Sequence, residues 1–174
     1  MKTAIFYLSH YGQTQKIAEA LAAELKDCEV FSLREKADIS TEELMQFDCI
    51  ILGASIRYGH FDPLLESFIH QYSTVLNSKK TAFFSVNLTA RKANRNTPET
   101  NVYTRKLLAR IEWKPNFVAV FAGALRYPRY SWLDKIMIRF IMTLTRGETD
   151  TAKEYEYTDW EKVRLFAAEI QKDS

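Results

Sequence analysis

Cysteine is scarce in this chain, which has only Cys28 and Cys49 among its 174 residues. No Cys-x-x-Cys pair is present, and neither thiol has a histidine at ligand spacing. We therefore expect no structural metal site and no disulfide framework, and this cysteine usage is consistent with a reducing compartment.

The chain also lacks a strong excess of one charge and lacks long apolar runs. The net charge of +2 is too small to suggest a nucleic-acid partner. No uninterrupted apolar run reaches the roughly twenty residues of a spanning helix. A strand-like segment follows Met1-Lys2 directly, so we expect no cleavable signal peptide. With 47% hydrophobic and 26% charged residues, we expect residues 1–174 to form a single globular domain.

Two familiar nucleotide-binding motifs are absent after the first apolar run, 4–8. There is no Gly-x-Gly-x-x-Gly fingerprint and no P-loop ending in Gly-Lys-Ser/Thr. Instead, the run is followed by Ser9, His10, Tyr11, Gly12, Gln13 and Thr14, and then by a helical pattern from Gln15 to about Lys26. Hydroxyls, a glycine and a helix N-terminus together favour a bound phosphate. The alternative is that the hydroxyls only cap the helix.

Strands and helices alternate along the rest of the chain. Further strands are expected at 29–33, 49–54, 81–86 and 116–124, and helices at 41–46, 63–72, 97–113 and from residue 158 onward. The helix starts are marked by capping boxes, Ser40 with Glu43 and Thr158 with Glu161, and by Asp62 before Pro63. This pattern predicts an α/β fold, a doubly wound five-stranded parallel sheet in the flavodoxin-like order 2-1-3-4-5.

That strand order predicts where a ligand binds. The site lies outside the carboxyl ends of the first and third strands, where the loops 9–14 and 55–60 meet. The loop 85–89 after the fourth strand is expected to form a third wall. The same order separates the strands that carry Cys28 and Cys49, so the two thiols are expected to be too far apart to bridge.

An insertion of some thirty residues, about 125–157, separates the fifth strand from the last helix. It contains a helical pattern over 132–144 with a wide apolar face, formed by Trp132, Leu133, Ile136, Met137, Phe140, Ile141 and Leu144. Asp134 is the only acid from Arg126 through Arg146, among five basic residues. An apolar face with a basic fringe favours an anionic membrane surface. The alternative is that this face packs against the domain or a second subunit.

Longer strings in the chain match one family. They are Gly-Ala-Ser-Ile-Arg-Tyr-Gly-His (53–60), Ser-Val-Asn-Leu (85–88), Ala-Arg-Lys (90–92), Ala-Gly-Ala-Leu-Arg-Tyr-Pro-Arg-Tyr (122–130) and Gly-Glu-Thr-Asp-Thr (147–151). In these strings the chain resembles the menaquinone-dependent protoporphyrinogen oxidases of bacterial haem synthesis, the HemG family. One departure is visible, because members commonly have an acidic residue just before the loop glycine, where this chain has His10-Tyr11.

The resemblance implies a flavoprotein that holds FMN and oxidises protoporphyrinogen IX to protoporphyrin IX, passing the electrons to menaquinone or another quinone. It implies FMN contacts from Ser9, His10, Tyr11, Gly12, Gln13, Thr14, Ser55, Ile56, Arg57, Tyr58, Gly59, Ser85, Val86, Asn87 and Leu88. Tyr58 would stack on the flavin ring, and His60 would assist proton movement. For each, the alternative is an ordinary surface side chain.

The substrate carboxylates need cations, and the basic neighbourhood offers Arg91, Lys92, Arg126 and Arg129. The amphipathic helix would touch the membrane through Trp132, Ile136, Met137, Phe140 and Ile141. These expectations place the protein peripherally on the cytoplasmic face of the cell membrane.

Three rival functions share parts of this pattern. A flavodoxin-type electron carrier has the fold and FMN, but usually presents an acidic face, whereas this chain has a pI near 8.5. An NAD(P)H-quinone reductase shares the flavin and the quinone. A membrane-binding module without FMN is the non-enzymatic alternative. The sequence leaves the oligomeric state open.

Overall fold

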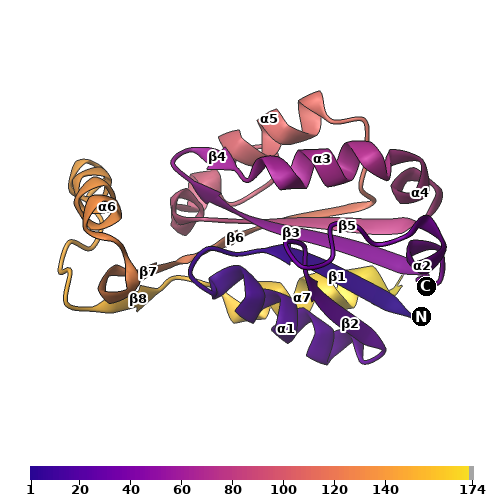
Figure 1. Cartoon of the computed structure of the whole chain (residues 1–174). Helices are drawn as coiled ribbons and strands as arrows, with labels where there is room; N and C mark the ends of the chain where they lie inside the picture. The colour runs from indigo at the N-terminus through magenta and orange to yellow at the C-terminus, as the bar shows by residue number, and fades with distance from the viewer. Residues whose placement is uncertain (173–174) are drawn as a thin grey trace.

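A five-stranded parallel sheet forms the centre of the computed structural model, which describes residues 1–172. Its strands follow the order β2-β1-β3-β5-β6 (Figure 1), because the short β4 pairs only with β3 in an antiparallel hairpin. This is the order predicted from the sequence. The strands are β1 (Thr3–Leu8), β2 (Cys28–Ser32), β3 (Cys49–Arg57), β4 (His60–Phe61), β5 (Lys80–Asn87) and β6 (Phe117–Ala122).

Helices cover both faces of this sheet (Figure 1). Helices α3, α4 and α5 lie over one face, and α1 and α7 lie over the other. Each face has its own apolar core, as the continuous apolar sequence of β3 requires of a strand that is covered on both sides. The helices are α1 (Gln13–Leu25), α2 (Thr41–Met45), α3 (Pro63–Gln71), α4 (Ser73–Ser78), α5 (Val102–Arg110) and α7 (Trp160–Lys172).

Several helix boundaries follow the sequence signals. The Ser40–Glu43 capping box is present, and the Asp62 side chain caps α3 with Pro63 in its first turn. The helix predicted over 97–113 is wrong at both ends, because α5 begins after Asn101, whose side chain accepts from the Thr104 N–H. Trp113 lies beyond the helix, fully buried, with its indole N–H donating to Thr81 Oγ1 at 3.0 Å. Its burial against the sheet overrides the helical pattern.

The predicted capping box at the last helix is also wrong. Asp159, not Thr158, caps α7, since its Oδ1 accepts from the N–H groups of Glu161 and Lys162. The Thr158 hydroxyl donates to the Ala122 carbonyl at 2.7 Å instead. The capping box does not form because the Thr158 hydroxyl bonds to Ala122, a residue distant in the sequence, instead of to the first turn of α7.

The two cysteines do not bridge. Cys28 and Cys49 both align with Thr3, from opposite sides of β1, so roughly two strand spacings of about 4.8 Å separate their backbones. Both thiols are free. The prediction that they cannot form a disulfide is confirmed.

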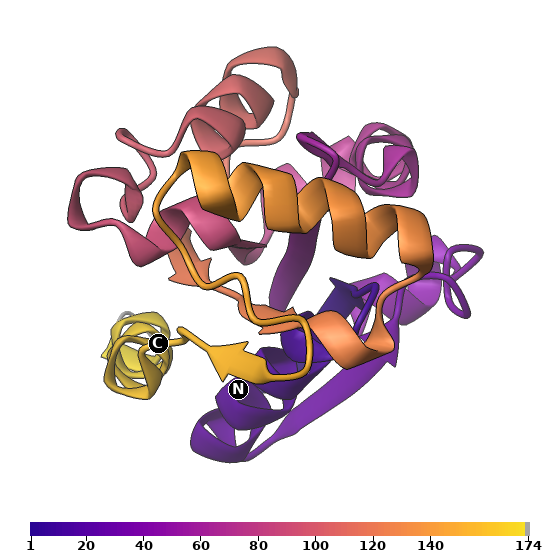
Figure 2. The same cartoon turned by 90° about the vertical axis from the view of Figure 1, so that its left-hand side faces the viewer.

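The insertion forms a small unit beyond the carboxyl ends of the strands (Figures 1 and 2). The strand predicted over 116–124 is interrupted at Gly123, and β7 (Ala124–Arg126) then pairs antiparallel with β8 (Glu154–Glu156). Between them, α6 (Trp132–Leu144) crosses the front of the molecule in Figure 2. None of the helices within residues 1–172 is both long and apolar enough to cross a membrane.

Most of the apolar face of α6 points away from the protein. Trp132 is 73% exposed and Leu144 68%, and the other five residues of the predicted face are between 38% and 67% exposed. The side that faces inward instead buries Asp134 and Met142. Packing of the whole apolar face against its own domain, one alternative from the sequence, is therefore wrong.

Candidate functional site

A cavity of about 350 Å³ lies at the carboxyl ends of the strands and is lined on one side by α6. The loops after β1, β3 and β5 line it together, as their positions in the sequence predict. The predicted cofactor residues that it brings together are Ser9, His10, Tyr11, Gln13, Thr14, Ser55, Ile56, Arg57, Tyr58, Gly59, Val86, Asn87 and Leu88. Its volume falls within the usual range of small-molecule sites.

The loop after β1 presents a helix N-terminus to this cavity. Gly12 has a φ of 95°, which favours glycine, and α1 begins directly after it. The Gly12 N–H donates to Ser9 Oγ at 2.9 Å, and no side chain caps the first turn of α1. Thr14 is 1% exposed, and its hydroxyl has no partner within residues 1–172. The alternative that this loop is only a helix cap is wrong, and its open donors suit a phosphate.

The second wall is the tight turn between β3 and β4. Strand β3 continues to Arg57, three residues past its predicted end, and Tyr58 and Gly59 then turn the chain with φ values of 52° and 78°. Positive φ at both central positions is typical of a type I′ hairpin. Tyr58 is 49% exposed, and the Arg57 guanidinium lies 4.8 Å from its ring centre.

The third wall is held by a buried amide. Asn87 Oδ1 accepts from the Ala90 N–H at 3.0 Å and from Asn101 Nδ2 at 3.0 Å. Ser85 does not line the cavity, because its hydroxyl is buried against Thr104 at 2.7 Å. Gly12 shapes the first loop without lining the cavity itself.

The insertion closes the cavity through Asp134 of α6. Tyr11 donates its hydroxyl to Asp134 Oδ2, and Arg57 donates to the same oxygen at 2.8 Å. Burial raises the pKa of Asp134, but these hydrogen bonds and the charge of Arg57 outweigh it, so its pKa is lowered. Burial and the bond to Asp134 raise the pKa of Tyr11 to about 12. Burial, then the charge of Arg57, lowers the pKa of His10 in the same loop.

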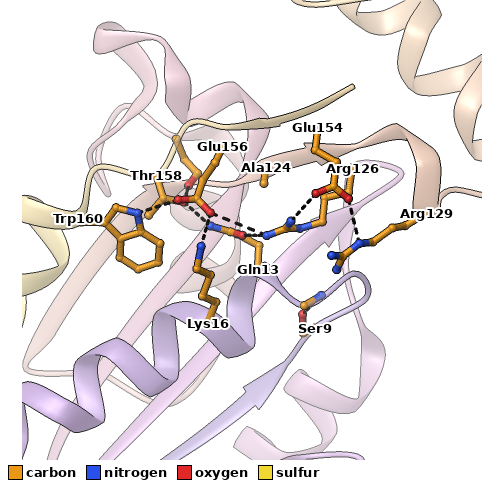
Figure 3. Close-up of polar contacts among 12 residues, drawn as sticks. Ser9, Gln13, Lys16, Ala124, Arg126, Arg129, Glu154, Glu156, Thr158 and Trp160 are labelled. Carbon is orange, nitrogen blue, oxygen red and sulfur yellow. Dashed lines mark hydrogen bonds and ion pairs between the residues drawn. The ribbon is translucent and has the colours of Figure 1, made fainter. Parts of the chain in front are cut away.

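A second link joins the insertion to the loop after β1, residues 9–14, which we call the phosphate-type loop (Figure 3). Arg126 of β7 donates to Gln13 Oε1 at 2.5 Å and to Glu154 at 3.2 Å. Gln13 in turn donates to Thr158 Oγ1 at 2.9 Å, so its side chain is held inside the protein and only its backbone N–H is open to a ligand. Lys16 lies 2.7 Å from Glu156 on the neighbouring strand β8. The start of α1 therefore depends on contacts with the inserted hairpin.

Other predicted residues lie outside this cavity. His60 is exposed and lines a smaller neighbouring pocket of about 250 Å³. Arg91 donates to the Leu88 carbonyl and to Thr145 Oγ1, and Arg129 pairs with Glu154 at 3.0 Å. Lys92 does not line the cavity, so of the four predicted substrate cations only Arg126 does.

Sequence reasoning missed part of the lining. The missed residues are Tyr103, Gly123, Ala124, Tyr130, Asp134 and Ile138. Asp134 had a visible signal, as the lone acid in a basic segment, but nothing local indicated that it turns inward. Met137 and Ile141, predicted as membrane contacts, also line the cavity. No group of three or more potential metal ligands occurs within residues 1–172.

The position of this cavity, at the switch point of a doubly wound sheet, is that of a flavodoxin-type site. The flavodoxin domain model matches residues 4–152, which implies a flavin cofactor. Among solved structures, the chain is similar in fold to oxidised flavodoxin 2 of Bacillus cereus, with a TM-score of 0.59 and 20% identity over the whole of both chains. Oxidised flavodoxin 1 of Bacillus cereus has a TM-score of 0.58 and 18% identity, over 100% of this chain and 99% of that one. The predicted flavodoxin-like fold is confirmed.

Relatives of much higher identity define the family. The chain is 47% identical to the protoporphyrinogen IX dehydrogenase [quinone] of Escherichia coli K12, over 98% of this chain and 94% of that protein. It is 45% identical to the enzyme of the same name from Leishmania major, over 97% of this chain and 74% of that protein. The chain belongs to the quinone-dependent protoporphyrinogen IX dehydrogenase family, which confirms the resemblance in its motifs.

Proposed function

We propose that this protein is an FMN-dependent dehydrogenase that oxidises protoporphyrinogen IX to protoporphyrin IX, with menaquinone or another quinone as the electron acceptor. The observation that carries the proposal is the cavity at the switch point. It combines an open helix N-terminus with walls formed by residues from the segments 53–60, 85–88 and 122–130, which carry the resemblance to the family. The enzyme's reaction would belong to haem synthesis.

The residues of the first loop fit the phosphate that distinguishes FMN from riboflavin. The open N–H groups of Gln13 and Thr14 and the unpartnered Thr14 hydroxyl supply donors in a buried place. The helix dipole of α1 adds a favourable field for the negative charge. The ring system would lie between the turn at Tyr58 and the Asn87 wall, where Tyr58 offers an aromatic face.

When bound, a flavin accepts two electrons as a hydride from an organic donor and delivers them to a quinone. The chain's own residues bind and orient the reactants and keep water out. Met137, Ile138 and Ile141 of α6 form an apolar roof over the cavity. Arg126, with 13% of its side chain exposed, and Arg57 are the cations of the cavity wall that can face substrate carboxylates.

We place the enzyme on the cytoplasmic face of the cell membrane as a peripheral protein. The exposed apolar face of α6 supports this proposal, because an apolar patch of this size on an isolated protein in water is unfavourable. Lys135, Arg139 and Arg146 border the face and suit anionic headgroups. Quinones dissolve in the same bilayer, so docking would bring the acceptor to the site.

The test is an anaerobic assay. FMN-loaded protein is mixed with protoporphyrinogen IX, with and without a menaquinone analogue, and porphyrin fluorescence is followed against a blank without enzyme. Quinone-dependent growth of fluorescence well above the blank is expected. Fluorescence at the level of the blank, from protein that visibly holds FMN, would reject the proposal. Rapid bleaching of the flavin by NADPH would favour the reductase instead.

A further inference from the structure

Asp134 is the one carboxylate among the described residues that line the cavity. It is 1% exposed, and the hydrogen bonds that its side chain accepts from Tyr11 and Arg57 both go to Oδ2. Its other oxygen, Oδ1, is buried without a partner within residues 1–172. The Ser131 hydroxyl accepts from the Asp134 N–H at 3.2 Å and so fixes the first turn of α6 around it.

A buried carboxylate oxygen without a donor is costly, so its place in the cavity wall points to a donor on the ligand. The wall beside it is apolar, with Met137, Ile138 and Ile141 on the following turns of α6. A quinone offers only carbonyl acceptors and cannot satisfy this oxygen. A porphyrinogen carries four pyrrole N–H donors and can do so.

We propose that Asp134 is a catalytic residue whose Oδ1 accepts a hydrogen bond from a pyrrole N–H of the porphyrinogen and stabilises the positive charge that develops as the macrocycle is oxidised. This inference rests on the proposed function. It assigns α6 a role in the chemistry that is separate from membrane docking.

The charge arises from the balance of each step. A C–H bond of a bridging CH₂ breaks, its electron pair leaves as hydride, which a bound flavin would accept, and the carbon forms a double bond to the adjacent pyrrole, which becomes cationic. A proton then leaves to solvent and restores neutrality. Three of the four bridges each lose a hydride in this way, and the three protons come from two pyrrole N–H groups and from the fourth bridge, so that six electrons and six hydrogens leave the substrate and three quinones take them up as hydroquinones. A fixed anion beside the cationic pyrrole lowers the energy of the charged state.

The surroundings of Asp134 keep it charged at neutral pH. Tyr11 and His10 face it from the β1 loop, and Arg57 faces it from the end of β3. The hydrogen bonds from Tyr11 and Arg57 outweigh the effect of burial, and the pKa of Asp134 is lowered. The carboxylate therefore acts through its charge, while the solvent takes the proton.

The experiment separates the two half-reactions of FMN-loaded Asp134→Asn by anaerobic stopped flow. We expect the rate of flavin reduction by protoporphyrinogen to fall roughly a hundredfold, as for loss of one charge-stabilising group. With FMN bound at saturation, reoxidation by a menaquinone analogue should be retained, and the Kd for FMN, measured by flavin titration, should change far less than the rate of reduction. An unchanged reduction rate would overturn the inference. So would a parallel loss of FMN affinity, which would mean that Oδ1 holds a flavin N–H or hydroxyl.

A second variant covers the case in which Asp134→Asn fails to fold. Tyr11→Phe removes one bond that lowers the pKa of Asp134, so that pKa rises. As the pH falls, the carboxylate is then protonated earlier, and flavin reduction should be lost at a higher pH than in the wild type. Tyr155→Phe in β8, outside the cavity, should leave the pH profile unchanged. Identical profiles for Tyr11→Phe and wild type would reject the role of Asp134.

The proposed function can fail separately from this inference. If protoporphyrinogen does not reduce the FMN of the wild-type protein, the function itself is wrong. If it reduces wild type and Asp134→Asn equally fast, only the role of Asp134 is wrong.

Discussion

At the scale of single residues, Tyr58 holds a conformation that its side chain disfavours. Its φ of 52° places it in the left-handed region, where a non-glycine residue costs roughly 1 kcal/mol. Asparagine tolerates this region and is preferred before glycine in such turns. Apart from an exposed contact with the Arg57 guanidinium, 4.8 Å from its ring centre, a half-exposed tyrosine at this position gains little in the folded apoprotein. The strain therefore indicates that the ring serves the ligand.

We predict opposite effects of Tyr58→Asn on stability and on binding. Relief of the strained turn should raise the Tm of the apoprotein by about 2 °C. Loss of the aromatic face should weaken FMN binding roughly threefold to tenfold. Thermal unfolding of the apoprotein and a flavin titration measure the two quantities.

Lys26→Asn is the matched control for that change. Lys26 has a φ of 67° at the end of α1 and does not line the cavity. Its replacement should leave FMN binding unchanged. If Tyr58→Asn bound FMN as tightly as the control, the stacking role of Tyr58 would be wrong.

At the scale of elements, α6 has two faces with different tasks. Asp134 and Met142 turn inward, while the exposed face carries Trp132, Phe140 and Leu144. The helical pattern of the sequence predicted that α6 exists and which residues form its apolar face. Which face turns inward followed from the Tyr11–Asp134–Arg57 contacts, which join residues far apart in the chain.

We predict that Ile136→Asp/Phe140→Asp detaches the protein from membranes. Two buried apolar side chains each contribute about 1.5–3 kcal/mol to insertion, so binding to anionic vesicles should fall roughly a hundredfold or more. Flotation with vesicles measures the bound fraction. The cavity lining excludes both residues, so FMN binding should be retained.

Met45→Asp/Leu165→Asp is the control for this variant, because it also adds two negative charges and removes two exposed apolar side chains. Met45 is 51% exposed on α2 and Leu165 is 52% exposed on α7, both on other parts of the surface. This control should float like the wild type. Equal flotation of both double variants would remove the membrane proposal and leave a second subunit as the partner of α6.

At the scale of the whole molecule, a half-buried and a buried carboxylate join distant segments. Asp62 caps α3 and pairs with Arg34 at 2.5 Å, and Asp134 joins α6 to the end of β3. Burial raises the pKa of Asp62, but the Leu64 N–H and Arg34 outweigh it, so its pKa is lowered. The exposed pair of Arg110 and Glu66 contributes less, because solvent screens it.

The lowered pKa of Asp62 predicts the direction of the pH dependence. A carboxyl group whose pKa is lower in the folded state stabilises the protein above its unfolded pKa of about 4, and this stability is lost as the pH falls through the folded pKa. The Tm should therefore fall on acidification below about pH 5. Asp62→Asn should lower the Tm at neutral pH and make the acid-side decline shallower. An unchanged slope in this variant would show that Asp62 does not contribute.

The sequence by itself determined the features that depend on neighbours along the chain. The alternation of apolar runs with amphipathic stretches determined the sheet order, and Gly12 after a strand and before a helix marked the phosphate-type loop. The motifs determined the family. Only the tertiary structure decided that Thr158 bonds to Ala122 rather than capping α7, that Arg126 reaches Gln13, and that Asp134 enters the cavity. These contacts join residues more than thirty positions apart, and the energy of pairing a buried polar group, set by the fold, outweighs the local preference of each side chain.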